Sequence, residues 1–156
     1  LENECEGGES IIVDGWQVAK DLKDDMPEYF SILQKFDVPF REFDEENETY
    51  AEAPLIKCSV DGKIESFRFS NQLMQMIDPT KDGIKEFYKA YHEISLRVHD
   101  KKYRSTFRLS GGEALVVASL RVLHAREPFI PSGKRHLQDA YFTYDNAANN
   151  IVLLSN

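Results

Sequence analysis

A histidine and an arginine in the C-terminal third of the sequence have the residue types and spacing of a metal-and-anion site. His124 follows the apolar run of residues 115–123, and Arg135 comes eleven residues later, at the start of what we expect to be the adjoining strand. A neutral imidazole binds Fe(II), and a guanidinium fork matches a carboxylate with two parallel hydrogen bonds. Taken alone, a histidine at a strand end is more often a structural core or surface residue, and that alternative stays open.

The other three histidines offer weaker chemistry. His92 and His99 lie seven residues apart on one helix face, but no third ligand is near them in the sequence, so we interpret both as surface residues. His136 directly follows Arg135, and in a regular strand it would point to the opposite face. We therefore interpret His136 as structural and place the candidate chemistry at His124 and Arg135.

The elements that must position these residues follow an α+β pattern. Helices are predicted at residues 16–22, 26–36 and 84–98, and strands at 9–13, 38–43, 55–60, 64–69, 103–109, 113–119, 121–125 and 134–144. Asp61 and Gly62 between two alternating runs indicate a β-hairpin. Residues 1–8 are interpreted as an irregular lead-in, and residues 44–48 as an acidic surface loop.

The order of these elements predicts the fold class. Strands come first and last with helices inserted between them, which indicates an α+β chain, mainly β, built on an antiparallel sheet or jelly roll. The aromatic stripe of residues 84–98 is interpreted as core packing rather than as a cofactor contact. We expect one domain over residues 1–156.

Composition limits the partners of this domain. The 156 residues include 19 Lys and Arg against 27 Asp and Glu, which gives a net charge of −8. Nucleic acids and anionic membranes do not attract a net anion, so neither is expected as a partner. No apolar run approaches the roughly 18–20 residues of a membrane span. Cys5 and Cys58 form neither a disulfide framework nor a C-x-x-C metal site.

Three segments resemble the family of γ-butyrobetaine and trimethyllysine dioxygenases. Residues 7–16 (GGESIIVDGW) are similar to its GG-(D/E)-S-x-x-VDG-(F/W) segment, and residues 121–126 (RVLHAR) to its R-(V/L)-L-H-(G/A)-R segment. Residues 135–141 (RHLQDAY) resemble R-H-L-x-x-x-Y, in a form closer to the butyrobetaine branch. The blocks occur in the family's order and spacing, and the resemblance covers essentially the whole chain.

The resemblance implies a double-stranded β-helix that uses Fe(II) and 2-oxoglutarate to hydroxylate a small betaine-type substrate. By position, His124 would bind iron, Arg135 would pair with the 5-carboxylate of 2-oxoglutarate, and Tyr141 would form one wall of a cage for a trimethylammonium group. A quaternary ammonium cannot donate a hydrogen bond, so aromatic faces suit it. Arg135 and Tyr141 are six residues apart, so a regular strand would put both on one face. For Tyr141 alone, a core tyrosine is the alternative.

Half of the implied iron site is missing from the sequence. A 2-His-1-carboxylate triad needs a His-x-Asp/Glu pair. The residues two positions after the four histidines are instead Ile94, Lys101, Arg126 and Gln138. In the family this pair lies upstream of the Gly-Gly segment, and the chain begins without Met inside a matched motif. We therefore expect the C-terminal part of a γ-butyrobetaine-type dioxygenase, inactive by itself. The alternative is a non-catalytic ligand-binding or interaction module derived from the same fold.

Two further positions depart from the family pattern. Ala118 and Ser119 stand where the family usually carries Asp-Asn, which weakens the hydrogen bonding expected around the iron-binding strand. Ser70 and Asn71 stand where it often carries Asn-Asn, so Asn71 is not counted as a substrate contact. By analogy with the butyrobetaine branch we expect a cytoplasmic homodimer, with mitochondria as the alternative location and ascorbate as a further candidate cofactor.

Overall fold

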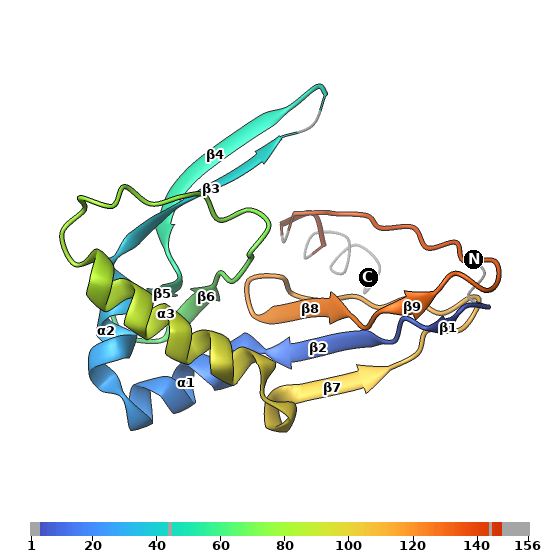
Figure 1. Cartoon of the computed structure of the whole chain (residues 1–156), viewed down its shortest axis with the longest axis horizontal. Coiled ribbons are helices and arrows are strands. Elements are labelled where there is room, and N and C mark those ends of the chain that lie inside the picture. The colour runs from blue at the N-terminus through green and yellow to red at the C-terminus, as the bar shows by residue number, and fades with distance from the viewer. Residues whose placement is uncertain (1–3, 44, 144, 148–156) are drawn as a thin grey trace, which may run out of the picture.

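The computed structural model of the chain describes residues 4–43, 45–143 and 145–147, which form a helical half and a sheet half side by side (Figure 1). In the helical half, three helices pack on one another: α1 (Gly15–Asp25), α2 (Pro27–Lys35) and α3 (Ile84–His99). Helices α1 and α2 pack against the predicted hairpin, which is formed by β5 (Ile56–Cys58) and β6 (Ile64–Phe67).

The sheet half is built around β2 (Ser10–Asp14). This strand lies between β7 (Arg104–Phe107) and β8 (Val122–Arg126), and both pairings are antiparallel. Beyond the end of this sheet, β1 (Glu6–Gly7) pairs with β9 (Phe129–Ile130). Because β2 runs directly into α1, the central strand of the sheet is also the connection to the helical half.

A second hairpin projects away from both halves (Figure 1). It pairs β3 (Asp37–Phe43) with β4 (Glu48–Pro54) along their whole lengths. The sequence predicted β3 but not β4, whose Glu and Ala residues favour strands weakly. Of the predicted acidic loop 44–48, residues 45–47 connect the two strands, Glu48 begins β4, and Asp44 lies outside the described residues.

The hydrophobic core lies in the helical half. Its largest fully buried side chains include Leu22, Leu33, Leu55, Ile56, Phe67, Phe87 and Ile94. The rings of Phe36 and Phe87 stack with their centroids 4.5 Å apart. The interpretation of the α3 aromatic stripe as core packing is therefore confirmed for Phe87, while Tyr88 on the same helix is exposed.

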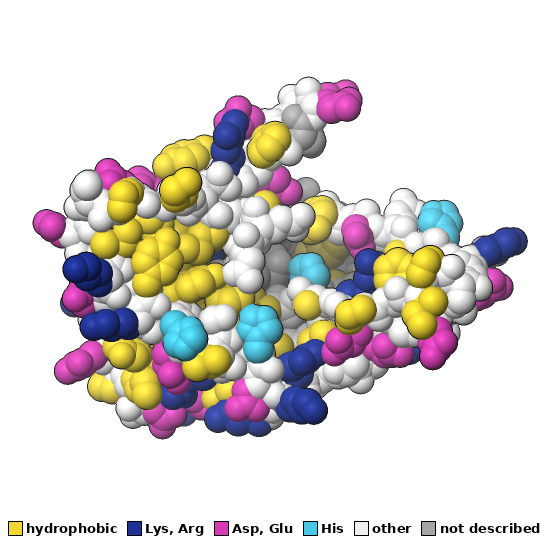
Figure 2. All heavy atoms as spheres, viewed as in Figure 1, with side chains coloured by type: hydrophobic (Ala, Val, Ile, Leu, Met, Phe, Trp, Pro, Cys, Tyr) yellow, Lys and Arg dark blue, Asp and Glu magenta, His cyan; other side chains and the backbone are white. Residues whose placement is uncertain are grey.

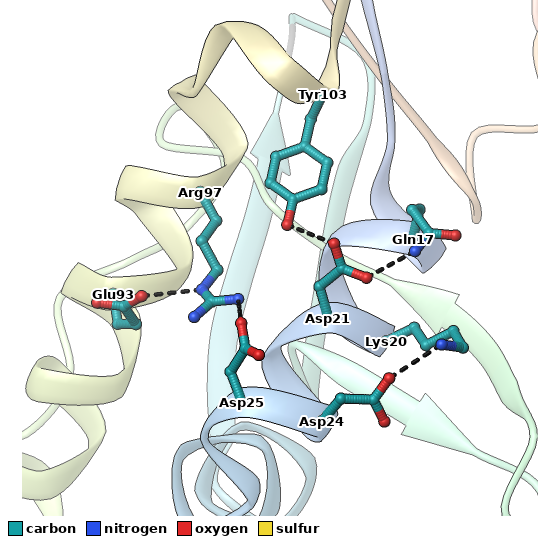
Figure 3. Close-up of polar contacts among 8 residues, drawn as sticks. All are labelled: Gln17, Lys20, Asp21, Asp24, Asp25, Glu93, Arg97 and Tyr103. Carbon is teal, nitrogen blue, oxygen red and sulfur yellow. Dashed lines mark hydrogen bonds and ion pairs between the residues drawn. The ribbon is translucent and has the colours of Figure 1, made fainter.

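A network of polar contacts joins α3 to α1 (Figure 3). Arg97 of α3 lies 2.8 Å from Asp25 at the end of α1 and 2.8 Å from Glu93, and its side chain is only 12% exposed. The Tyr103 hydroxyl, in the short 3₁₀ helix η1 (Lys101–Tyr103), donates to Asp21 at 2.7 Å. This hydrogen bond holds the pKa of Asp21 below its ordinary value. The contacts fix the chain against α1 just before it enters β7.

The mixed α+β class is confirmed, but the prediction that the chain is mainly β is wrong for the described residues. Residues 113–119 and 134–143 were expected to be strands and form none, and Tyr144 lies outside the described residues. An alternating pattern becomes a strand only when another strand pairs with it over several residues, and the described residues of these two segments show only a single β-bridge, at Arg135. The described strands form small sheets, so closure into a jelly roll stays a prediction. No described helix is long and apolar enough to cross a bilayer.

The Arg97 network gives a stability prediction. Replacing Arg97 by Leu should lower the free energy of unfolding by about 2 kcal/mol, because Glu93 and Asp25 each lose a charged hydrogen-bond donor. Urea unfolding followed by circular dichroism measures this. Lys20→Ala is the control, since the Lys20–Asp24 pair of α1 is 62% and 61% exposed and its loss should leave stability unchanged within error. Equal effects of the two changes would contradict the account.

Candidate functional site

A cavity of about 550 Å³ lies in the sheet half and is lined by β8 and the C-terminal segment. Figure 2 shows the surface hollowed in this region. His124, Arg135 and Tyr141 all line it, together with Arg126. The structure therefore brings the three residues singled out by sequence into one cavity, although they come from a strand and from an irregular segment.

His124 reaches the cavity from β8. It pairs with Ile12 of the central strand, and side chains two apart on a strand share a face, so Arg126 lies on the same side. Both side chains are exposed at the cavity wall. No described residue makes a hydrogen bond or an ion pair with the His124 ring. A neutral imidazole has a nitrogen lone pair that can bind a metal ion.

The donor set around His124 is too small to hold a metal ion alone. Among the described residues, no group of three or more His, Cys, Asp and Glu side chains could hold a metal. Iron of the facial-triad class needs two histidines and a carboxylate. The described residues thus fit one ligand of such a site and do not complete it.

Arg135 lines the same cavity and rests on an aromatic ring. Its guanidinium carbon lies 5.1 Å from the ring centroid of Phe129, and that of Arg126 lies 4.8 Å from the same centroid. Two guanidinium groups on one ring form a positively charged part of the cavity wall, which suits an anionic ligand. His136, by contrast, is exposed and does not line the cavity.

Tyr141 is 88% exposed, so it lies outside the hydrophobic core that the described residues form. Its neighbour Phe142 also lines the cavity and is 62% exposed. The argument that strand alternation puts Arg135 and Tyr141 on one face is wrong, because residues 134–143 form no strand. The two side chains meet the same cavity because the irregular segment runs along it.

Asp14 holds the turn that leads into β8. Its carboxylate accepts hydrogen bonds from the Trp16 and Gln17 amides and so caps α1. The Arg121 guanidinium donates to the same carboxylate, with Nη2 2.5 Å from Oδ2. These bonds from Arg121, helped by the two amides, hold the pKa of Asp14 below its ordinary value. The Trp16 indole donates to the Leu120 carbonyl at 3.1 Å. The start of the His124 strand is thus attached to α1.

Comparison with known proteins identifies the family. The model of the taurine catabolism dioxygenase TauD, TfdA family matches residues 1–141. The chain belongs to this family. The resemblance seen in the three sequence segments is thereby confirmed at the level of the TauD/TfdA family.

This TauD/TfdA chain is similar to several γ-butyrobetaine and trimethyllysine dioxygenases. It is 30% identical to the γ-butyrobetaine dioxygenase of Pseudomonas sp. strain AK-1 over 155 residues, 99% of this chain and 40% of the relative. It is 27% identical to human γ-butyrobetaine dioxygenase, over 95% of this chain and 40% of the relative. It is 26% identical to the trimethyllysine dioxygenase of Meyerozyma guilliermondii, over 99% of this chain and 40% of the relative. The chain spans about 40% of the length of these relatives.

Sequence reasoning missed part of the cavity of this TauD/TfdA chain. Arg126 stands in the R-x-L-H-x-R block two residues after His124, and strand alternation from His124 would have placed it on the same face. Phe129 does not line the cavity itself but carries the Arg126 and Arg135 guanidinium groups on its ring, and a lone aromatic residue gave no signal of that role in the sequence. The apolar residues 114–117, expected to be a strand, line the cavity instead.

The Asp14–Arg121 contact predicts a pH-dependent stability. The pKa of Asp14 is lowered in the fold, so its contribution is present above the unfolded value of about 3.9 and is lost as the pH falls through the folded value. Asp14→Asn keeps an oxygen that can cap α1 but loses the ion pair. Urea unfolding should show the variant less stable than the wild type at neutral pH. The difference should shrink as the pH falls below the unfolded value of about 3.9, because protonation of Asp14 removes the same charge from the wild type. A difference that stays equal as the pH falls would contradict the assignment.

Proposed function

We propose that this chain carries part of the active site of an Fe(II)- and 2-oxoglutarate-dependent dioxygenase. Its substrate would be a small trimethylammonium compound, with γ-butyrobetaine and its conversion to L-carnitine in carnitine biosynthesis as the first candidate. The observation that carries the proposal is the single cavity lined by His124, Arg135 and Tyr141. The names of the relatives support the substrate class.

Arg135 would bind the co-substrate. A planar guanidinium pairs with a carboxylate through two parallel hydrogen bonds, and stacking on Phe129 limits the directions in which the guanidinium of Arg135 can point. Because His124 lines the same cavity, 2-oxoglutarate held by its 5-carboxylate at Arg135 would lie in the cavity where His124 would hold iron. Iron, when bound, would supply the activation of dioxygen for oxidation of the substrate.

Tyr141 would orient the substrate cation. A trimethylammonium group packs on aromatic faces, and each desolvated face contributes on the order of 0.5–2 kcal/mol. Phe142 and the carboxylate-bearing Asp139 also line the cavity, which gives it a second aromatic face and a negative charge. The 2-oxoglutarate anion would then bind at Arg126 and Arg135, and the trimethylammonium cation would bind at these aromatic and acidic groups in another part of the wall.

The remaining iron ligands would come from a His-x-Asp/Glu pair outside the 156 residues. Within the described residues, β7 and β8 are the outer strands of their sheet, and further strands pairing there would complete a double-stranded β-helix. The exposed apolar side chains of Leu115, Val116 and Leu120 would then gain partners. Both features support the jelly roll as part of the proposal.

The competing function is a non-catalytic ligand-binding or interaction module. The observation that favours it is the incomplete donor set around His124 in the described residues. The two functions differ in what the full-length protein does with 2-oxoglutarate. A dioxygenase releases succinate when supplied with Fe(II) and substrate, whereas a module binds ligand without turnover.

The pair of neighbours Arg135 and His136 gives the test of the proposed site. In the full-length protein, Arg135→Ala should lower kcat/KM for 2-oxoglutarate by about 100-fold, because a charged bidentate contact is lost. His136→Ala should retain most of the activity, because His136 does not line the cavity. Succinate release with Fe(II) and γ-butyrobetaine measures both, and equal effects would contradict the site. Trimethyllysine as a parallel substrate separates a wrong substrate from a lost activity.

The 156 residues alone should release no succinate. One imidazole does not hold iron in a defined geometry, so the isolated chain would lack the metal on which turnover depends. The same succinate assay, run on this chain and on a protein extended upstream through a His-x-Asp/Glu pair, measures the difference. Turnover by the isolated chain would contradict the proposed division of the iron site. A folded extended protein that is silent with both substrates would favour the non-catalytic module.

A further inference from the structure

Gly8 lies against the Arg135 side chain although the two residues are far apart in the sequence. Its φ of +74° is in the left-handed region that favours glycine. A Cβ at Gly8 would lie 2.7 Å from Nη1 of Arg135 and 3.1 Å from the Cβ of Phe129. The first distance is well below a normal van der Waals contact, so any side chain at this position would collide with the guanidinium.

The backbone around Gly8 is fixed, so it cannot yield to such a collision. The Gly8 amide donates to the Pro128 carbonyl at 3.0 Å, and Gly7 pairs with Phe129 between β1 and β9. A Cβ at Gly7 would itself lie 2.6 Å from the Pro128 carbonyl oxygen. The two glycines thus let the chain run directly alongside β9. The part that would have to move is the far end of Arg135, which is a flexible side chain.

Moving the Arg135 guanidinium would also break its stacking contact with the Phe129 ring. It lies 5.1 Å from the Phe129 ring centroid, and Phe129 is the other neighbour of a Gly8 Cβ. Gly8, just after β1, and Phe129 of β9 therefore bound the space that the Arg135 guanidinium occupies. Two parallel hydrogen bonds to a carboxylate need a defined guanidinium plane, so this space sets how Arg135 can receive an anion.

We propose that Gly8 is a positioning residue for 2-oxoglutarate binding: the absence of a side chain at Gly8 leaves the space that holds the Arg135 guanidinium on Phe129. Gly8 touches no ligand and acts only through Arg135. The inference rests on the proposed function and deepens it, because it assigns a role in co-substrate affinity to the Gly-Gly segment, which is 127 residues before Arg135 in the chain.

The test compares two glycines with the same backbone strain. Gly62 has a φ of +79°, close to that of Gly8, but a Cβ there would meet nothing within 4 Å. In the full-length protein, both Gly8→Ala and Gly62→Ala should lower the Tm through backbone strain, and Gly8→Ala should lower it at least as much because its Cβ also meets Phe129. Only Gly8→Ala should raise the Kd for 2-oxoglutarate, by about tenfold, as expected for the loss of one good charged contact. Anaerobic calorimetry with Fe(II) present measures Kd apart from turnover, and kcat at saturating 2-oxoglutarate should stay near the wild-type value.

A double variant separates this inference from the proposed function. In the Arg135→Ala background, adding Gly8→Ala should weaken binding no further, because the colliding group is already gone. If Arg135→Ala weakens binding but Gly8→Ala does not, the inference is overturned and the proposed function stands. If neither change weakens binding, the role of Arg135 fails as well.

A second variant covers the case in which Gly8→Ala does not fold. Phe129→Leu removes the ring from the same space without touching the glycine backbone. It should raise the Kd for 2-oxoglutarate several-fold by the loss of one cation–π contact. An unchanged Kd for a folded Phe129→Leu protein would overturn the proposal.

Discussion

The Asp14 carboxylate joins the parts of the chain that must stay together for the cavity to exist. It ends the central strand β2, caps α1, and accepts the Arg121 guanidinium from the turn that precedes β8. The core that stabilises the molecule lies in the helical half, whereas most side chains around the cavity are exposed. The side chains around the cavity therefore have few packing contacts with one another that could fix their positions. The geometry of the His124 strand therefore depends on its attachment to the helices, and Asp14 provides a charged, hydrogen-bonded link in that attachment.

The segment of residues 7–16 contacts the chain on both sides of the His124 strand. At its end, Gly15 admits the Phe67 ring and the Arg121 carbonyl, which would lie 2.5 and 2.8 Å from a Cβ at that position. At its beginning, Gly8 lies against Arg135, and between them β2 pairs with the His124 strand. Gly8 and Gly15 carry no side chain that could bind iron or a co-substrate. Glycine is required at these positions because neighbouring side chains and backbone lie too close for a Cβ. These close contacts give a physical reason for the Gly-Gly and Val-Asp-Gly-Trp pattern in this segment.

Local sequence patterns were enough to predict most helices and strands, but they did not predict which strands pair with one another. The periodicity of α1, α2 and α3 and the Asp61-Gly62 turn of the β5–β6 hairpin are properties of short stretches of sequence. β4 was missed because its composition is weak and its strand depends on β3. Residues 113–119 and 134–143 have strand patterns, but neither forms a described strand and only Arg135 makes a single β-bridge, so both segments run irregularly along the cavity. Residue type and spacing singled out His124, Arg135 and Tyr141, whereas Arg126 and Phe129 emerged only from the geometry.

The most direct test of the account is the coupling between Fe(II) and 2-oxoglutarate binding. Anaerobic calorimetry on the full-length protein gives the affinity for 2-oxoglutarate with and without Fe(II), for the wild type, for His124→Ala, and for His92→Ala as an exposed control on α3. If His124 and Arg135 serve one site, Fe(II) strengthens 2-oxoglutarate binding in the wild type and in His92→Ala, and the strengthening is lost in His124→Ala. Wild-type protein without coupling, or coupling that survives in His124→Ala, would contradict the claim that this cavity holds both ligands.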